Sequence, residues 1–295
     1  MRVFVTGATG LIGSAVVPEL LGAGHSVVGL ARSDASAERL TTAGADVLRG
    51  ELSDLDVLRQ GATEADGVVH LAFVHDFANF GASIQADAAA ITALGEVLEG
   101  TGKPLVTTSG LLGLPAGRVA SERDMPTYAP RLSESTTLPF AQRGVRASSV
   151  RLAPSVHGPA DLHGFVPALI GIARAKGAAA YIGDGSGCWP GVHQLDAGAL
   201  YRLAVESAPA GSVLHGAGDE GVPTRAIAEV IGARLDLPVV SVEPGEAAQE
   251  HFGWMAPFFA MDVRASHALT TELLGWEPAQ PGLLADLEAG FYFAS

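Results

Sequence analysis

The first thirteen residues, Met1–Gly13, read MRVFVTGATGLIG and decide the fold. Residues 2–5 form a short apolar run rich in β-formers, which predicts a buried strand. Apolar residues then recur at helical spacing, at Val16, Val17, Leu20 and Leu21. This spacing predicts a helix over Ser14–Gly24, so the three glycines lie in a turn between a strand and a helix.

The glycine turn is the first candidate binding site of the chain. In a strand-to-helix turn the backbone comes close to a pyrophosphate and offers it the free N–H groups of the helix N-terminus. Side chains at Gly7 and Gly10 would block this approach, and Gly13 allows the helix to pack on the strand. Their place between a strand and a helix makes these glycines a stronger signal than a lone triplet. We therefore expect a dinucleotide to contact Gly7, Thr9, Gly10, Leu11, Ile12 and Gly13.

The stretch TGATGLIG, at Thr6–Gly13, resembles the extended and atypical short-chain dehydrogenase/reductase superfamily; its G-x-x-G-x-x-G spacing is one residue longer than the usual fingerprint. The segment LGWEP, at Leu274–Pro278, resembles the closing signature of extended members, so the resemblance covers nearly the whole chain. It implies an α/β protein with a Rossmann doubly wound parallel sheet and a smaller, mostly helical C-terminal substrate lobe. We place an NAD(P)-binding Rossmann domain at residues 1–155, with a returning strand near 212–215, and the partly interleaved substrate lobe at 156–295.

Composition excludes several classes of protein. The chain has 295 residues, of which 48% are hydrophobic, yet no apolar run is long enough to span a bilayer. Its 18 Lys and Arg residues against 32 Asp and Glu give a net charge of −14, which argues against a nucleic-acid partner. The single cysteine, Cys188, excludes an intramolecular disulfide framework, and no grouping has the spacing of metal ligands. We expect a soluble cytoplasmic protein that binds a small-molecule substrate and no metal, nucleic acid or membrane.

The second predicted strand, Ser26–Ala31, ends at Arg32-Ser33-Asp34. In dinucleotide folds this position meets the adenosine ribose, where an acidic residue binds a 2′-hydroxyl and an arginine suits a 2′-phosphate. Because Arg32 comes first, followed by Ser33, we favour NADP(H) over NAD(H). Asp34 is instead a candidate cap for a helix over Ala35–Ala43. A solvated surface position is the alternative for Arg32.

Three further segments resemble cofactor contacts of the superfamily. Gly50–Asp54 resembles its G-D-L-x-D pattern, which implies Leu52 as a wall for the adenine, with Glu51 in place of the usual aspartate. The strand Gly67–Leu71 leads into a segment that resembles H-x-A, which implies contacts near the cofactor ribose at Leu71, Ala72 and Phe73. The segment Ala153–Pro159 resembles R-P-x-x-V-Y-G-P, which implies contacts to the nicotinamide at Pro154 and Val156.

The expected chemistry centres on Ser109, the last residue of a strand predicted over Pro104–Ser109. In the resembling enzymes a serine at this strand end hydrogen-bonds the substrate carbonyl. About twenty residues later the superfamily has a Tyr-x-x-x-Lys pair, in which the lysine lowers the tyrosine pKa for proton exchange. This chain lacks the pair, because Leu132 stands four residues after Tyr128. The only lysines are Lys103 and Lys176.

Two residues are candidates for the proton exchange. Tyr128 lies among prolines, where a loop residue without function is the alternative, and the nearby Arg131 supplies charge but cannot shuttle a proton. His157 takes the place of a tyrosine in the nicotinamide segment, and a packing role is its alternative. By contrast His70, inside a strand, is expected to be buried and hydrogen-bonded and not to be a catalyst.

The C-terminal half is predicted to be mainly helical. Phe165–Lys176 has the pattern of an amphipathic helix, and Asp196 is expected to cap a helix over Ala197–Glu206. An aromatic cluster over residues 251–259 lines the substrate cleft, packs the lobe or forms a homodimer interface, and the sequence does not distinguish these alternatives.

These observations predict an NADP(H)-dependent oxidoreductase that transfers a hydride to or from a small carbonyl or imine compound. Ser109 would polarise the substrate oxygen, and Tyr128 or His157 would exchange the proton. The alternative is an NADP(H)-binding redox sensor or scaffold without turnover, because the lysine is missing. An epimerase or dehydratase needs the same acid–base pair and is the third hypothesis.

Overall fold

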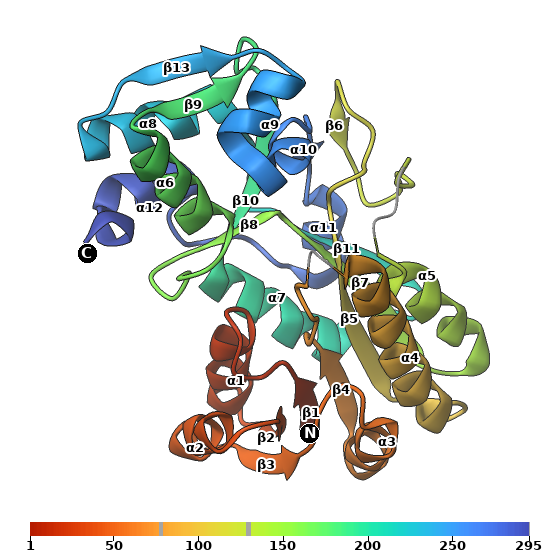
Figure 1. The fold of residues 1–295 in the computed structure, drawn as a ribbon. Coiled ribbons are helices and arrows are strands. Elements are labelled where there is room, and N and C mark those ends of the chain that lie inside the picture. The colour runs from red at the N-terminus through yellow and green to blue at the C-terminus, as the bar shows by residue number, and fades with distance from the viewer. Residues whose placement is uncertain (77–78, 128–130, 295) are drawn as a thin grey trace.

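The structure is a computed structural model that describes residues 1–76, 79–127 and 131–294. Its centre is a parallel sheet of seven strands in the order β11-β7-β5-β4-β1-β2-β3 (Figure 1). The strands are β1 (Arg2–Thr6), β2 (Ser26–Ala31), β3 (Asp46–Arg49), β4 (Gly67–His70), β5 (Pro104–Gly110), β7 (Arg146–Leu152) and β11 (Ser212–Gly216). The order reverses between β1 and β4, the switch point at which open α/β sheets bind ligands. The predicted Rossmann sheet is confirmed.

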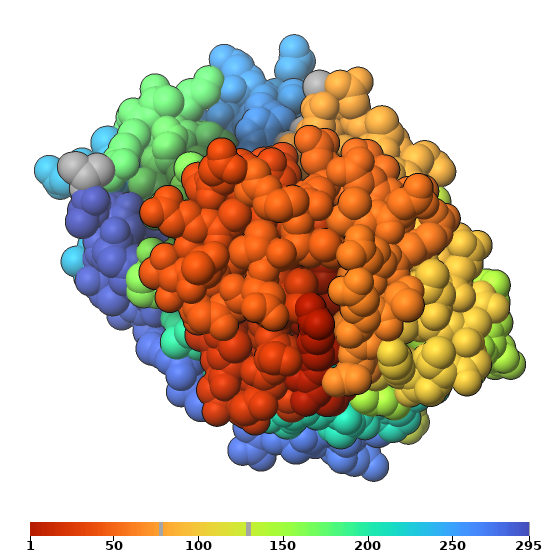
Figure 2. Space-filling model, turned by 90° about the horizontal axis from the view of Figure 1, so that it is seen from below, coloured from red at the N-terminus to blue at the C-terminus, as the bar shows by residue number. Residues whose placement is uncertain are grey.

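Helices cover both faces of the sheet, so it is doubly wound (Figure 1). One face carries α1 (Gly13–Gly22), α2 (Asp34–Thr42) and α7 (Gln194–Ser207), and the other carries α3 (Leu55–Glu64), α4 (Phe80–Leu98) and α5 (Ser133–Thr137). Val16 and Leu200 lie in the core of the first face, and Leu58 and Leu94 in that of the second. Seen from below, the N-terminal segments, coloured red to orange, make one continuous surface (Figure 2).

The C-terminal half adds a second lobe above the sheet in the view of Figure 1. Its helices are α6 (Phe165–Lys176), α8 (Thr224–Leu235), α9 (Glu246–Phe252), α10 (Ala256–Phe259) and α12 (Leu283–Ala289), whereas α11 (Ala268–Leu274) packs against β11 and α7 of the large sheet. It also contains a three-stranded sheet of β8 (Ser155–His157), β10 (Cys188–His193) and β12 (Asp219–Pro223). Two-stranded sheets join β9 (Ala179–Ile182) to β13 (Val239–Val242) and β6 (Val119–Ala120) to β14 (Arg264–Ala265). No helix in the described ranges is both long and apolar enough to cross a bilayer.

After α5 the chain continues as a 3₁₀ helix over Leu138–Arg143, because Pro139 has no N–H to continue the α-helical bonds. The helix predicted to begin after Asp196 begins at Gln194, and the imidazole of His193 caps it by accepting from the Leu195 N–H at 3.2 Å. The Asp196 carboxylate instead accepts two backbone N–H groups of the C-terminal segment, from Ala279 and Gln280.

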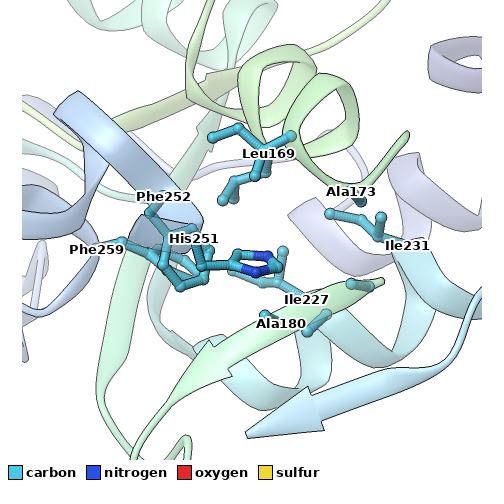
Figure 3. A pocket seen from close by; sticks show the side chains of 11 residues that line it. Leu169, Ala173, Ala180, Ile227, Ile231, His251, Phe252 and Phe259 are labelled. Carbon is cyan, nitrogen blue, oxygen red and sulfur yellow. The ribbon is translucent and has the colours of Figure 1, made fainter. Parts of the chain in front are cut away.

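Much of the aromatic cluster packs the second lobe. Phe252 and Phe259 are buried in its core, and the Trp189 indole donates to the Phe258 carbonyl at 3.2 Å. Around them is a cavity of about 10 Å³ into which the His251 ring projects, shown in Figure 3. This volume accommodates about one water molecule, so it is not a substrate site.

Candidate functional site

The glycine turn follows β1 and leads directly into α1. Gly7 has a φ of +66°, and a Cβ there would lie 2.7 Å from the Ala72 nitrogen. A Cβ on Gly13 would overlap the Gly7 carbonyl oxygen and lie 2.6 Å from the backbone of Ala8. Gly13 is therefore required by the turn itself and not, as predicted, by the packing of the helix on the strand. A Cβ on Gly10 would meet only the Gly7 oxygen, at 3.3 Å, so this side of the turn is open.

The open turn also presents unused hydrogen-bond donors. Among the described residues, the backbone N–H groups of Leu11, Ile12 and Gly13 have no acceptor. They lie at the N-terminal end of α1, where the helix dipole favours negative charge. The turn therefore fits the pyrophosphate of a dinucleotide.

Arg32 lies at the end of β2. It is exposed and makes no hydrogen bond or ion pair with the part of the chain that the structure describes. Asp34 is ion-paired with Arg49 at 2.6 Å, and the predicted cap at Asp34 is wrong because Ser33 caps α2 by accepting from the Ser36 N–H at 3.2 Å. The guanidinium of Arg32 is thus available at the predicted adenosine position, whereas the carboxylate of Asp34 has a partner.

One contact ties the predicted adenosine side to the glycine turn. The Arg39 guanidinium donates to the Thr9 carbonyl at 2.5 Å. Leu52 is half-buried and packs against the core of the α3–α4 face, while Glu51 is exposed. Asp54 precedes α3, but its carboxylate accepts from the Glu51 N–H at 2.8 Å and does not cap the helix.

The end of β4 is joined to the end of β1. The Leu71 N–H donates to the Thr6 carbonyl at 3.2 Å, and the Ala72 N–H to the Thr6 hydroxyl at 3.3 Å. His70 is buried, with Nδ1 2.8 Å from the Thr6 hydroxyl and Nε2 3.2 Å from the Asp87 carboxylate. The prediction of a buried, hydrogen-bonded histidine is confirmed.

An arginine lies where the superfamily pattern calls for the catalytic pair. Tyr128 itself falls outside the described residues. Arg131, just before α5, lies over the Phe73 ring with its Cζ 3.7 Å from the ring centroid. Its Nη2 is 3.4 Å from Asp87, whose other carboxylate oxygen accepts the Ser133 hydroxyl at 2.5 Å. Burial alone would raise the pKa of Asp87, but hydrogen bonds and charges from these neighbours and His70 lower it below its usual value.

Ser109, at the carboxyl end of β5, is held by a charged cluster. Its hydroxyl donates to Glu134 at 3.3 Å and accepts from Ser149 at 3.2 Å. Glu134 forms a bidentate ion pair with Arg151, with both N–O distances 2.7 Å. In this geometry the Ser109 hydroxyl proton points to the Glu134 carboxylate.

The predicted nicotinamide segment forms β8. Val156 pairs with Val192 of β10, and Pro154 is half-buried just before the strand. His157 is fully buried, and its Nδ1 is 2.7 Å from the Asp286 carboxylate of α12. Burial lowers the pKa of His157, and Asp286 opposes this shift. Among the described residues, His157 makes no hydrogen bond to Ser109 or its cluster, so the structure does not bring these two predicted catalytic residues together.

The other side of His157 faces a second, polar cavity of about 110 Å³. Its Nε2 has no hydrogen-bond partner among the described residues and lies 3.9 Å from Asp219. The Asp219 carboxylate accepts the Leu283 N–H at 2.8 Å, which fixes the start of α12. No grouping of three or more potential ligands in the described ranges has the geometry of a metal site.

The two charged networks of this site were not predicted from the sequence. Asp87 lies mid-helix and Arg151 inside a strand, where charged side chains need partners. A charged residue within an otherwise apolar element is the signal that points to such a partner, although it does not identify it.

One consequence of the Arg151 network is a dependence of stability on pH. The His215 ring accepts a hydrogen bond from Arg151 through Nε2, at 3.4 Å, and donates one to the Ser266 carbonyl through Nδ1. Burial lowers the pKa of His215 to about 4, and the negative charges of Glu122 and Glu134 oppose this shift only in part. Since the folded-state pKa lies below the unfolded value of about 6.5, stability is full above pH ~6.5 and falls as the pH drops toward ~4.

Urea unfolding between pH 7 and pH 4 measures this loss, and His215→Gln is the control. The amide accepts from Arg151 and donates to Ser266 without titrating, so the variant is expected to lose less stability over the same range. If the free energy of unfolding depends on pH identically in the two proteins, His215 is not responsible for the loss of stability at low pH.

The strand order, the glycine turn and the free amides define a Rossmann-type nucleotide-binding protein. The model of the NAD dependent epimerase/dehydratase family matches residues 3–101. An uncharacterized protein of Schizosaccharomyces pombe is 49% identical over 99% of this chain and 100% of its own length. An uncharacterized protein of Saccharomyces cerevisiae is 44% identical over 99% of each. The chain belongs to the NAD-dependent epimerase/dehydratase family.

Solved structures agree on the fold. MoeE5 in complex with UDP-glucose and NAD is 24% identical, with a TM-score of 0.77 over 99% of this chain and 97% of that one. The dTDP-glucose 4,6-dehydratase DesIV of Streptomyces venezuelae, with NAD and TYD bound, is 18% identical, with a TM-score of 0.77 over 98% and 97%. Family and neighbours together support an enzyme that uses a nicotinamide cofactor.

Proposed function

We propose that this chain is an NADP(H)-dependent oxidoreductase that transfers a hydride to or from a small carbonyl or imine compound. The observation that carries the proposal is the open glycine turn, with unused N–H groups at Leu11, Ile12 and Gly13, at the switch point of a Rossmann sheet. When bound, the cofactor supplies the hydride chemistry; the protein positions the reactants and moves the proton.

The preference for NADP(H) rests on the arginine at the end of β2. Arg32 has no partner among the described residues, and a 2′-phosphate offers it charge-assisted hydrogen bonds. Asp34, the acidic residue nearby, is ion-paired with Arg49 at 2.6 Å. Similar structures contain NAD, and the proposed preference for NADP(H) therefore rests on the residues of this chain alone.

The proton is assigned to Ser109 and Glu134. In the oxidation direction Ser109 accepts the proton of a substrate hydroxyl and passes its own proton to Glu134, 3.3 Å away; reduction reverses both transfers. Arg151 keeps Glu134 in place through two hydrogen bonds. This pathway requires neither a tyrosine nor a lysine.

Two other functions use the same fold. A redox sensor would bind NADP(H) and transfer no hydride, and the absence of Tyr-x-x-x-Lys favours it. An epimerase or dehydratase is favoured by the activities of similar structures, which include a dTDP-glucose 4,6-dehydratase and a UDP-glucose 4-epimerase of Thermotoga maritima.

The absorbance of the reduced nicotinamide distinguishes the three functions. Net NADPH consumption with a panel of carbonyl or imine compounds supports the oxidoreductase. Tight binding without consumption supports the sensor, and conversion of a nucleotide sugar without net consumption supports the epimerase or dehydratase.

Arg32→Ala is expected to weaken NADPH binding by about 10-fold or more and to leave NADH binding nearly unchanged, because only NADPH has the 2′-phosphate. Isothermal titration of both cofactors measures the two affinities. Arg59→Ala is the control, since this half-exposed arginine on α3 pairs only with Asp56 and Glu96 among the described residues. Equal losses for NADPH and NADH would refute the assignment of the 2′-phosphate to Arg32.

A further inference from the structure

The polar cavity beside His157 has the room and the entrance that a small ligand needs. It lies where β8, β10 and the start of α7 meet the segment before α12, elements that Figure 1 shows side by side. Its volume is about 110 Å³, against about 10 Å³ for the cavity beside His251, which accommodates about one water molecule. Gln280 and Pro281 line the polar cavity and are exposed, so it opens to solvent.

The walls of this cavity carry negative charge. Asp196 and Asp219 line it, and Asp286 contacts the rings of the two histidines that line it, His157 and His193. Among the described residues, the partners of these three carboxylates are backbone N–H groups and the two imidazoles, and no lysine or arginine lines the cavity. A recess lined by charge of one sign attracts counter-ions, so this cavity favours a cation.

His157 adds an acceptor that has no donor. The residue is fully buried, and its Nδ1 lies 2.7 Å from Asp286. An ionised carboxylate only accepts hydrogen bonds, so the ring proton is on Nδ1. Burial lowers the pKa of His157, which leaves Nε2 unprotonated at neutral pH. Nε2 has no partner among the described residues and lies 3.9 Å from Asp219, on the side of the ring that faces the cavity. A buried acceptor is normally paired with a donor.

Asp219 supplies the charge next to this acceptor. Its Oδ2 accepts the Leu283 N–H at 2.8 Å, and its Oδ1 accepts no hydrogen bond from the described residues. The side chain is 29% exposed, so it is accessible from the cavity. A Cβ on Gly282 would lie 2.6 Å from Oδ1, so the glycine keeps this oxygen uncovered.

We propose that this cavity binds the primary ammonium group of a small amine, with N–H groups that donate to Asp219 and to Nε2 of His157. An ammonium group has three donors and no acceptor, which matches walls rich in acceptors. A metal ion is a poorer match, because no grouping of potential ligands in the described ranges has the geometry of a metal site. The cavity shares no residue with the glycine turn or the Ser109 cluster, and the ammonium site does not require the proposed function.

Methylammonium chloride is the probe for this site. It is titrated into the protein by calorimetry at constant chloride, balanced with sodium chloride, with and without NADPH. Tetramethylammonium has the same charge and no N–H donor, and we expect methylammonium to bind at least about 10-fold more tightly because charge-assisted hydrogen bonds supply the affinity. Asp219→Asn is expected to weaken methylammonium by about 10-fold or more, because the amide oxygen still accepts the Leu283 N–H but the charge is lost.

Glu220→Gln is the matched control. It removes one negative charge from the next residue of β12, whose exposed side chain points to the opposite face of the strand and does not line the cavity. Gly282→Ala is a second test, since it keeps every charge and covers Oδ1 of Asp219; it is expected to weaken methylammonium as well. Thermal unfolding establishes that each variant is folded.

Three results would overturn the ammonium site. They are no binding of methylammonium by the wild type, equal affinities of the Asp219→Asn and Glu220→Gln variants, and binding of tetramethylammonium or potassium as tight as that of methylammonium. Ammonium chloride distinguishes the free ion from an amine, and binding of either one through Asp219 supports the site. If NADPH does not bind the wild type, the proposed function fails, and the affinities for methylammonium still decide on this cavity.

Discussion

Gly13→Ala is expected to weaken NADPH binding at least about 100-fold, because several charge-assisted N–H contacts, each contributing roughly 1.5–3 kcal/mol, depend on the shape of the turn. The new methyl group would overlap the Gly7 carbonyl oxygen and lie 2.6 Å from the backbone of Ala8. Both contacts are with the backbone, so no side chain can rotate away. The turn must open, which moves the N–H groups that are proposed to bind the pyrophosphate. Overpacking of this kind also lowers the free energy of unfolding, by about 1–3 kcal/mol.

Gly22→Ala is the matched control, because it makes the same substitution at the other end of α1. A Cβ at Gly22 meets no atom within 4 Å, and alanine favours the helix by up to about 1 kcal/mol. Calorimetric titration of NADPH and urea unfolding of both variants measure the difference. If Gly13→Ala binds NADPH as tightly as Gly22→Ala, the glycine turn is not the cofactor site.

The sequence predicts the fold well where the signal is local. The strand at Arg2–Thr6 and the helix that follows are set by residues adjacent in the chain, and their hydrophobic periods differ clearly. The glycine turn is equally local, since the contact that excludes a side chain at Gly13 is with the Gly7 carbonyl oxygen, six residues earlier in the chain. The small sheets of the second lobe were harder to predict. Strand β8 has three residues, and its pairing with β10 depends on contacts far along the chain.

The sequence predicts less of the catalytic side because its contacts are distant. Arg151 is 17 residues from Glu134, and Arg131 is 44 residues from Asp87. The absence of Tyr-x-x-x-Lys shows only that the usual chemistry is missing. The structure shows what occupies that region: two buried networks, each with one arginine and one carboxylate. The cap predictions at Asp34 and Asp196 were wrong for a related reason, since a carboxylate near a helix start also serves distant partners.

Glu134→Gln is expected to lower the free energy of unfolding by about 3–5 kcal/mol, because it leaves the buried Arg151 guanidinium without a counter-charge. Arg151 is 1% exposed, and its other contacts are the Asp124 carbonyl at 2.8 Å and His215, neither of which carries the negative charge that Glu134 supplies. Glutamine retains a carbonyl oxygen for the Ser109 hydroxyl. The predicted proton transfer to residue 134 is lost nonetheless, since an amide is not a base at neutral pH.

Two comparisons separate the lost charge from other effects of the substitution. Glu229→Gln breaks an exposed ion pair with Arg225 within α8, and little change is expected there because water screens such pairs. The double variant Glu134→Gln, Arg151→Met removes both charges and is expected to regain much of the lost stability, because the unpaired buried cation is gone. Urea unfolding of the four proteins gives the free energies. A loss below about 1 kcal/mol for Glu134→Gln would mean that the pair behaves as a surface salt bridge. In that case Glu134 would be neither fixed by Arg151 nor poised to take a proton from Ser109.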